Sequence, residues 1–123
     1  MDKLNFHGFT QEDADNLIPL VDLLVDYQVI ARRDGLLSLS EYVAAREKNE
    51  FMRIVLMAAG NNFAPDELEL LGQFLTRATG YGYTDYTTRL EWPLIIQGAK
   101  YIVNGEYPPR MKEMLLALLD KRS

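Results

Sequence analysis

Apolar residues recur at three- and four-residue spacing along most of the chain, and this period constrains the fold more than any other feature. The longest stripe consists of Leu17, Leu20, Leu24, Tyr27 and Ala31. Such a spacing places the apolar side chains on one face of a helix. No stretch shows the strict alternation that is typical of a half-buried strand. The helical stretches are separated by short runs with Gly, Asn or Pro, so consecutive helices should pack against each other. We therefore predict an all-α fold with about six helices packed as antiparallel helical hairpins.

The residues at the ends of these stretches indicate where each helix begins and ends. Thr10 with the acids after it predicts a first helix, and Arg32-Arg33 before Gly35 predicts its end. Pro19 should kink this helix or lie in the first turn of one that begins again near Ile18. The later helices are expected to begin at Ser38 or Ser40, after Asn49, at Pro65, around Pro93 and at Pro108-Pro109.

Residues 80 to 88 read Gly-Tyr-Gly-Tyr-Thr-Asp-Tyr-Thr-Thr and show no helical stripe, so we predict a Gly/Tyr-rich loop there. Tyr81, Tyr83 and Tyr86 on this loop, with Trp92 beyond it, form a candidate aromatic cluster. Tyr and Trp side chains commonly anchor protein interfaces. The alternative is that the loop folds over the core and buries its rings.

Two of the predicted hairpins have similar sequences. The passage from Ile54 to Leu75 parallels the passage from Ile102 to Leu119 when one residue is deleted before the aromatic. Glycine, aromatic, proline and the following apolar doublets then align. These residue types are also general devices for ending and restarting helices, so chance similarity is the alternative.

Composition narrows the class of protein. The chain has 123 residues, which suits one globular domain over residues 1 to 123. It has no cysteine, which excludes a disulfide framework and a thiol nucleophile. With 18 acids and 13 bases it carries a net charge of −5, so nucleic acid is not an expected partner. The longest uncharged run, Ile54 to Pro65, is too short to span a bilayer, and residues 1 to 7 lack an apolar signal core. We expect a soluble, cytoplasmic protein without membrane insertion.

The residues that could perform chemistry are few. His7 is the single histidine, and no cluster of carboxylates accompanies it in the sequence. Asp22 with Asp26, or Glu47 with Glu50, could face a metal, but without a Glu-x-x-His pattern a solvated acidic face explains them better. The sequence therefore predicts no catalytic residue, no metal site and no cofactor.

Two segments carry a family resemblance. Ala31-Arg32-Arg33-Asp34-Gly35-Leu36-Leu37-Ser38-Leu39 resembles the Ala-Arg-Arg-Glu-Gly-Leu-Leu-Ala-Leu-Glu signature that opens the cytoplasmic loop of MotA-type flagellar-motor stator proteins. The passage from Ile95 through Asn104-Gly105-Glu106-Tyr107-Pro108 to Leu119 resembles the C-terminal tail of that family. With the intervening helices, the resemblance covers about two thirds of the chain. It lacks the membrane helices of the family, so ion conduction is not implied.

The resemblance implies a non-enzymatic protein-interaction module similar to the stator's cytoplasmic domain, with a protein as its partner. A motor component is one candidate partner, and self-association into a homo-oligomer stays open. Arg32 and Arg33 match the basic part of the signature. The family's acid after Leu-Leu-x-Leu is Ser40 here, with Glu41 one place later. The candidate partner-binding residues are Arg32, Arg33, Glu41, Tyr81, Tyr83, Tyr86 and Trp92. The alternative function is a small-molecule-binding or catalytic helical domain with its pocket at the aromatic loop.

Overall fold

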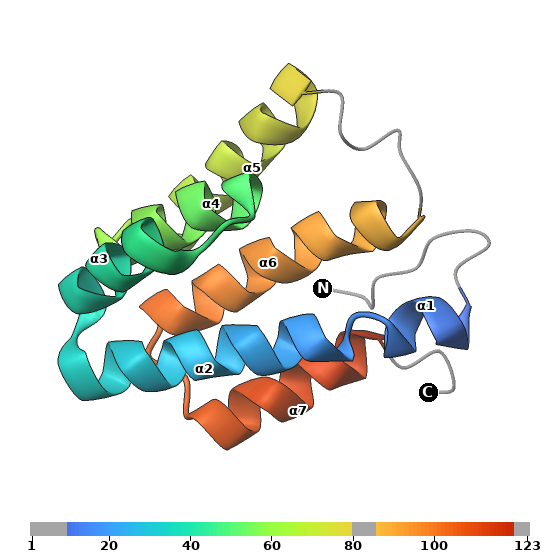
Figure 1. The fold of residues 1–123 in the computed structure, drawn as a ribbon, viewed down its shortest axis with the longest axis horizontal. Coiled ribbons are helices and arrows are strands. Elements are labelled where there is room, and N and C mark those ends of the chain that lie inside the picture. The colour runs from blue at the N-terminus through green and yellow to red at the C-terminus, as the bar shows by residue number, and fades with distance from the viewer. Residues whose placement is uncertain (1–9, 80–85, 120–123) are drawn as a thin grey trace.

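The computed structural model describes residues 10–79 and 86–119, and these contain seven helices and no strand (Figure 1). Side chains are described throughout these ranges except at residues 79 and 86–89. The helices are α1 (Gln11–Asp15), α2 (Ile18–Asp34), α3 (Leu36–Arg46), α4 (Glu50–Gly60), α5 (Pro65–Thr79), α6 (Tyr86–Val103) and α7 (Pro108–Leu119). Six of them have 11 residues or more, and they pack against each other. The predicted all-α fold is confirmed.

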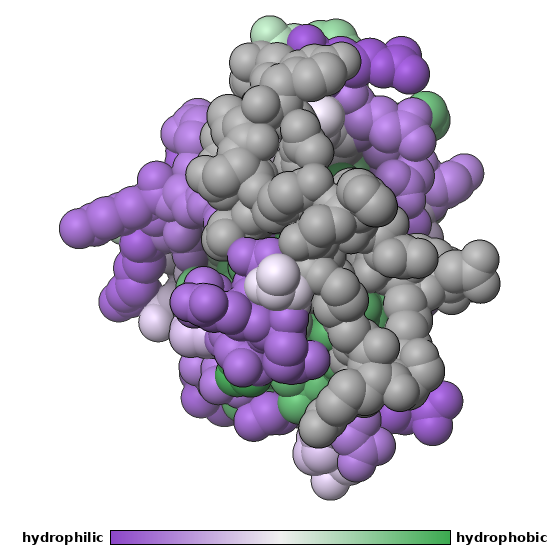
Figure 2. Space-filling view, turned by 90° about the vertical axis from the view of Figure 1, so that its right-hand side faces the viewer, coloured by the Kyte–Doolittle hydropathy of each residue, from purple (hydrophilic) through white to green (hydrophobic). Residues whose placement is uncertain are grey.

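Helix α6 runs through the middle of the molecule, with α2 and α7 on one side and α3, α4 and α5 on the other (Figure 1). It contacts α2, α4, α5 and α7, while α3 packs between α2 and α4. Its buried apolar residues are Leu90, Trp92, Leu94, Ile95, Ile96, Ala99 and Ile102. A helix apolar over so much of its surface must be covered on several sides, and this explains its central position. On the side of the molecule shown in Figure 2, most of the described residues at the surface are hydrophilic. In the described part of the chain, no helix is long and apolar enough to cross a membrane.

The predicted division of the first helix near Pro19 is confirmed. Thr10 caps α1 in a capping box, in which its hydroxyl accepts from the Asp13 N–H and its own N–H donates to the Asp13 carboxylate. The chain turns at residues 16 and 17, and α2 begins at Ile18. Pro19 then lies in the first turn of α2, where backbone N–H groups have no acceptor within the helix, so the missing N–H of proline costs no hydrogen bond.

Helix α3 begins earlier than predicted. It starts at Leu36 rather than at Ser38 or Ser40, because Gly35 both ends α2 and begins α3. Gly35 has a φ of 96° and donates its N–H to the Ala31 carbonyl, while its own carbonyl accepts from Leu39. Ser40 is buried against α4, where its hydroxyl donates to the Met57 carbonyl at 3.4 Å.

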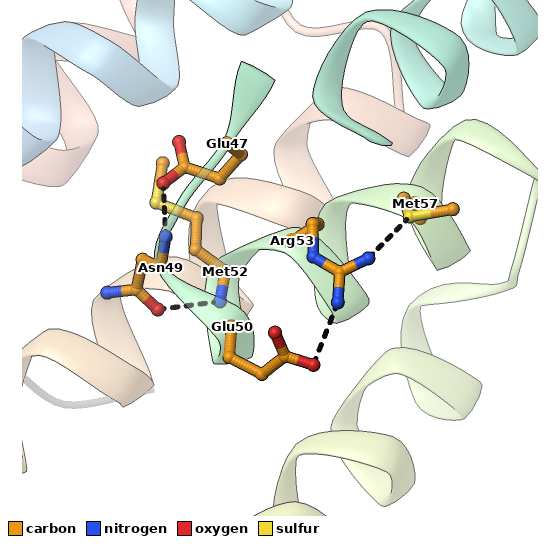
Figure 3. A network of polar contacts seen from close by, with 6 residues as sticks. All are labelled: Glu47, Asn49, Glu50, Met52, Arg53 and Met57. Carbon is orange, nitrogen blue, oxygen red and sulfur yellow. Dashed lines mark hydrogen bonds and ion pairs between the residues drawn. The ribbon is translucent and has the colours of Figure 1, made fainter. Parts of the chain in front are cut away.

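The predicted cap of α4 is confirmed. The Asn49 side-chain oxygen accepts from the Met52 N–H at 3.0 Å, and its backbone N–H donates to Glu47 at 2.9 Å. Figure 3 shows both bonds, together with the ion pair between Glu50 and Arg53 one turn along the helix. The extended connection between α3 and α4 is therefore fixed by side-chain hydrogen bonds at the residues where the helix must begin.

Pro65 opens α5 as predicted, but α6 begins at Tyr86. Residues 86–88 are therefore helical, although the sequence suggested that the loop would include them. Residues 80–85, the rest of the predicted loop, lie outside the described part of the chain. Pro93 lies within α6 rather than at its start, so the helix continues across a residue that cannot donate a backbone hydrogen bond.

The two similar hairpins, α4–α5 and α6–α7, share the same turn. The Phe63 N–H donates to Ala58 and the Asn62 N–H to Ala59; likewise the Glu106 N–H donates to Tyr101 and the Gly105 N–H to Ile102. Asn62 and Gly105 have φ values of 65° and 70°. This is the Schellman arrangement of a left-handed residue after a helix. The bonds correspond at a constant offset of 43 residues, so Asn62 matches Gly105 without any deletion. The gapped alignment of Gly60 with Gly105 was wrong.

Candidate functional site

Three connections lie at one end of the helical array, on the left in Figure 1. They are the α2–α3 corner at residues 32–37, the α4–α5 turn at 60–64 and the α6–α7 turn at 104–107, and we name this region the turn end. The α2–α3 corner is joined to the α6–α7 turn by Arg32. It also contacts the end of α4, since Gly60 lies against the backbone of α3.

Arg32 and Gln28 hold the end of α6. The Arg32 Nη1 donates to the Gly105 carbonyl at 2.6 Å, and the fully buried Gln28 Nε2 donates to Glu106 at 2.7 Å and to Tyr101 at 3.3 Å. Gly105 and Glu106 lie in the turn after α6, where their carbonyls belong to no helix, so these donors supply the partners that the turn itself does not. Arg32 is therefore exposed and at the same time makes a contact that holds the fold together.

Arg33, the other base of the pair, makes its side-chain contact with its neighbour in the sequence. Its guanidinium forms an ion pair with the neighbouring Asp34 at 2.9 Å, and the two side chains are 67% and 44% exposed. The hydrogen bond between them raises the pKa of Arg33 and lowers the pKa of Asp34. Both groups are thus charged over the whole physiological range, and the exposed pair adds little to stability.

Two segments that lie far apart in the chain, residues 31–39 and 95–119, meet at the turn end. Arg32 belongs to the first segment, and Gly105, whose carbonyl it binds, belongs to the second. These residues are 73 positions apart in the chain. The sequence analysis did not single out Gln28. Its position beside the long apolar stripe of α2 was the available signal, because a polar residue buried there must form hydrogen bonds.

Ser40 and Glu41 are neighbours on α3 that differ in their exposure to solvent. Ser40 is 6% exposed, and its Cβ lies 2.6 Å from the position that a Cβ on Gly60 would occupy. An acidic side chain at position 40 would be buried against α4 without a counter-charge. Glu41, one residue further around α3, is exposed. An acidic contact from this helix can therefore be made from position 41 and not from position 40.

Trp92 is the one residue of the predicted aromatic cluster whose side chain the structure describes, and it is not exposed. Trp92 is 5% exposed and stacks on Phe51, with ring centroids 3.7 Å apart. Its assignment as a partner-binding residue was wrong, because its apolar ring is more stable within the core of α4 and α6. Tyr81 and Tyr83 lie outside the described residues. Tyr86 begins α6, and its side chain is not among those described.

Exposed apolar side chains accompany Arg33 at the turn end. Leu37 is 64% exposed, Tyr107 62% and Phe63 39%. Each belongs to a different one of the three connections. Exposed large apolar residues of this kind are typical of surfaces that bind another protein.

A second polar cluster joins α2 to α6 through the α3–α4 connection. The Tyr27 hydroxyl donates to Glu47 at 2.5 Å, and the Asn49 amide donates to Glu91 at 2.8 Å. Burial, followed by the hydrogen bond to Glu47, raises the pKa of Tyr27. Tyr42 packs edge-on against Tyr27. These bonds fix three segments to each other. The described residues include no group of three or more acidic or histidine side chains that could hold a metal ion.

No family model, curated protein or solved structure matches this chain.

Proposed function

We propose that this chain is a non-enzymatic protein-interaction module that binds a protein partner through its turn end. The proposal extends the resemblance to the cytoplasmic domain of flagellar stators, and a rotor component of the flagellar motor is the first partner to test. Its binding surface would combine Arg33, Leu37 and Tyr107 of the turn end with Glu41, which lies further along α3.

The observation that carries this proposal is the contact between Arg32 and Gly105. It brings together two segments that resemble the stator family separately and that are far apart in the chain. Residues 1 to 60 contain ten acids and six bases, and Arg33, although it is paired with Asp34, presents an exposed positive charge in that acidic half. Such a charge would steer a partner that presents carboxylates, and the apolar residues would supply the area that holds it.

Charge reversal of Arg32 would also break its bond to Gly105, so the test changes Arg33 alone. Arg33→Glu changes the exposed charge and leaves that bond in place. Binding to the purified rotor protein, measured by surface plasmon resonance, should weaken by about tenfold. The loss should be smaller at high salt, because ions screen the exposed charge.

Lys112→Glu is the matched control. Lys112 is also exposed and paired with an acid, Asp22, at 3.0 Å. Asp22 lies 12 residues before Asp34 in α2, which places it about 18 Å along the helix axis from the turn end. The control should bind as the wild type does. If Arg33→Glu bound as tightly as the wild type, the turn end would not be the binding surface. If the wild type did not bind, the rotor protein would not be the partner.

A further inference from the structure

The outer face of α5 carries the two most exposed large apolar side chains of the described residues. Leu70 is 65% exposed and Phe74 is 68% exposed. Gly72 faces the opposite way, where its backbone packs closely on Ile96 of α6. Two residues in a helix correspond to a rotation of about 200°, so residues 70 and 74 both lie opposite Gly72.

Opposite charges flank this apolar pair along the same face. Glu67 lies three residues before Leu70, and Arg77 lies three residues after Phe74; both are exposed. At 100° per residue the four positions fall within an arc of about 80°. The order along the helix is therefore acid, apolar, apolar, base, and it is symmetric about residue 72.

That order is complementary to itself when it is reversed. In an antiparallel copy, position 67 faces position 77 and position 70 faces position 74. Each Glu67 then meets Arg77 of the second copy, and each Leu70 meets Phe74. A parallel copy would instead place like charges opposite each other, which is unfavourable.

We propose that α5 is a self-association surface, on which a second copy of this chain packs its own α5 antiparallel, with the twofold axis passing between the two exposed faces at the level of residue 72. Such an interface is isologous, as in most homodimers. The apolar pair supplies the buried area, and the two pairs of Glu67 and Arg77 fix the direction. The surface is separate from the residues proposed to bind a protein partner at the turn end.

A contact between single helices is smaller than a standard protein interface. The dimer should therefore be weak and should form only as the protein concentration is raised. Sedimentation velocity over a wide range of concentrations should show wild-type protein passing from monomer to dimer. Leu70→Ser combined with Phe74→Ser should remain monomeric throughout. Leu37→Ser, which replaces an equally exposed leucine on α3, should dimerise as the wild type does.

Charge reversal tests the antiparallel direction. In a dimer of Arg77→Glu, positions 67 and 77 would place two acids opposite each other. In a dimer of Glu67→Lys, the same positions would place two bases opposite each other, so each variant should fail to associate with itself. Mixed together, the two variants restore opposite charges at both ends and should form a heterodimer. Glu67 also accepts a hydrogen bond from the Ala64 N–H at 2.8 Å, so thermal melts must show that Glu67→Lys is folded.

A monomeric wild type at all concentrations would overturn the proposal. So would a dimer that persists in the double serine variant, since the interface would then lie elsewhere. Failure of the two folded charge variants to associate when mixed would exclude the antiparallel arrangement. None of these outcomes bears on binding of the rotor protein to the turn end.

Discussion

At the scale of single residues, polar side chains decide where helices meet. Gln28 and Arg32 lie one turn apart on α2, and together they reach three carbonyls around the end of α6. Tyr27, next to Gln28 in the chain, reaches Glu47 in the other direction. A single turn of α2 therefore fixes both the α6–α7 turn and the α3–α4 connection. The apolar stripe buries this helix, and the polar residues beside it set its position.

Tyr27 should make stability dependent on alkaline pH. Burial and the bond to Glu47 raise its pKa above the ordinary 10.0, so the folded protein keeps this proton where the unfolded chain loses it. The resulting stability is complete below pH 10 and is lost as pH rises above that value. In urea unfolding, the free energy of the wild type should therefore fall more steeply above pH 10 than that of Tyr27→Phe. Parallel curves for the two proteins would contradict the assignment.

At neutral pH the same variant should be less stable by about 1 to 2 kcal/mol, because Glu47 loses a hydrogen bond to a buried donor. Tyr107→Phe removes a hydroxyl from an exposed ring and should leave the free energy of unfolding unchanged.

The residue scale is also where the sequence was least informative. Arg32 and Arg33 have the same local pattern, yet one binds a carbonyl 73 residues away and the other pairs with its neighbour. Trp92 follows a stretch without helical period, and its burial depends on Phe51 from another helix. Such partners are brought together only by tertiary packing, which local spacing does not encode.

At the scale of helices, two glycines allow close crossings. Gly60 of α4 lies against the backbone of α3, and Gly72 of α5 lies against a side chain of α6. A methyl group at Gly60 would lie 2.6 Å from the Ser40 Cβ and 2.8 Å from the Leu36 carbonyl oxygen, so backbone would have to move. A methyl group at Gly72 would meet the end of the Ile96 side chain, which can rotate. Gly60→Ala should therefore destabilise the protein by about 1 to 3 kcal/mol, and Gly72→Ala by less.

Urea unfolding of these variants measures both costs. Ile96→Val removes the Cδ1 atom that lies nearest to a methyl group at position 72. Gly72→Ala should therefore lose less free energy of unfolding in the Ile96→Val protein than in the wild type, and the difference is the coupling energy of the two positions. No such relief should follow for Gly60→Ala. A Gly60→Ala protein as stable as the wild type would mean that α3 and α4 do not cross so closely.

Helix ends that depend on local chemistry could be predicted from the sequence. Thr10, Asn49 and Pro65 act at the positions expected of them, because capping involves only residues within one turn. The start of α6 could not be predicted in this way, since its first turn includes β-branched residues after a Gly/Tyr-rich stretch. The alignment of the two repeated turns was also wrong. The sequence aligned Gly60 with Gly105, but the residue that shares the left-handed conformation of Gly105 is Asn62.

At the scale of the whole molecule, the helices differ in how fully they are covered. Helix α6 is enclosed by neighbours and buries residues along most of its length. Helix α5 buries Leu68 and Gly72 and exposes its opposite face. It is fastened to α6 by the close approach at Gly72 and by the ion pair between Glu69 and Lys100 at 2.5 Å. Opening α5 therefore exposes less apolar surface than opening α6.

Amide hydrogen exchange should reveal this difference. Exchange from α6 requires disruption of the core, so its amides should be protected by nearly the full free energy of unfolding, whereas α5 should open at a lower cost. Peptides from the two helices can be compared by mass spectrometry at low protein concentration, where self-association through α5 is absent. Equal protection of α5 and α6 would indicate that the bundle opens as one unit. The same comparison in the Leu70→Ser and Phe74→Ser double variant should preserve the order, because these side chains are exposed and the protection of α6 comes from its own buried contacts.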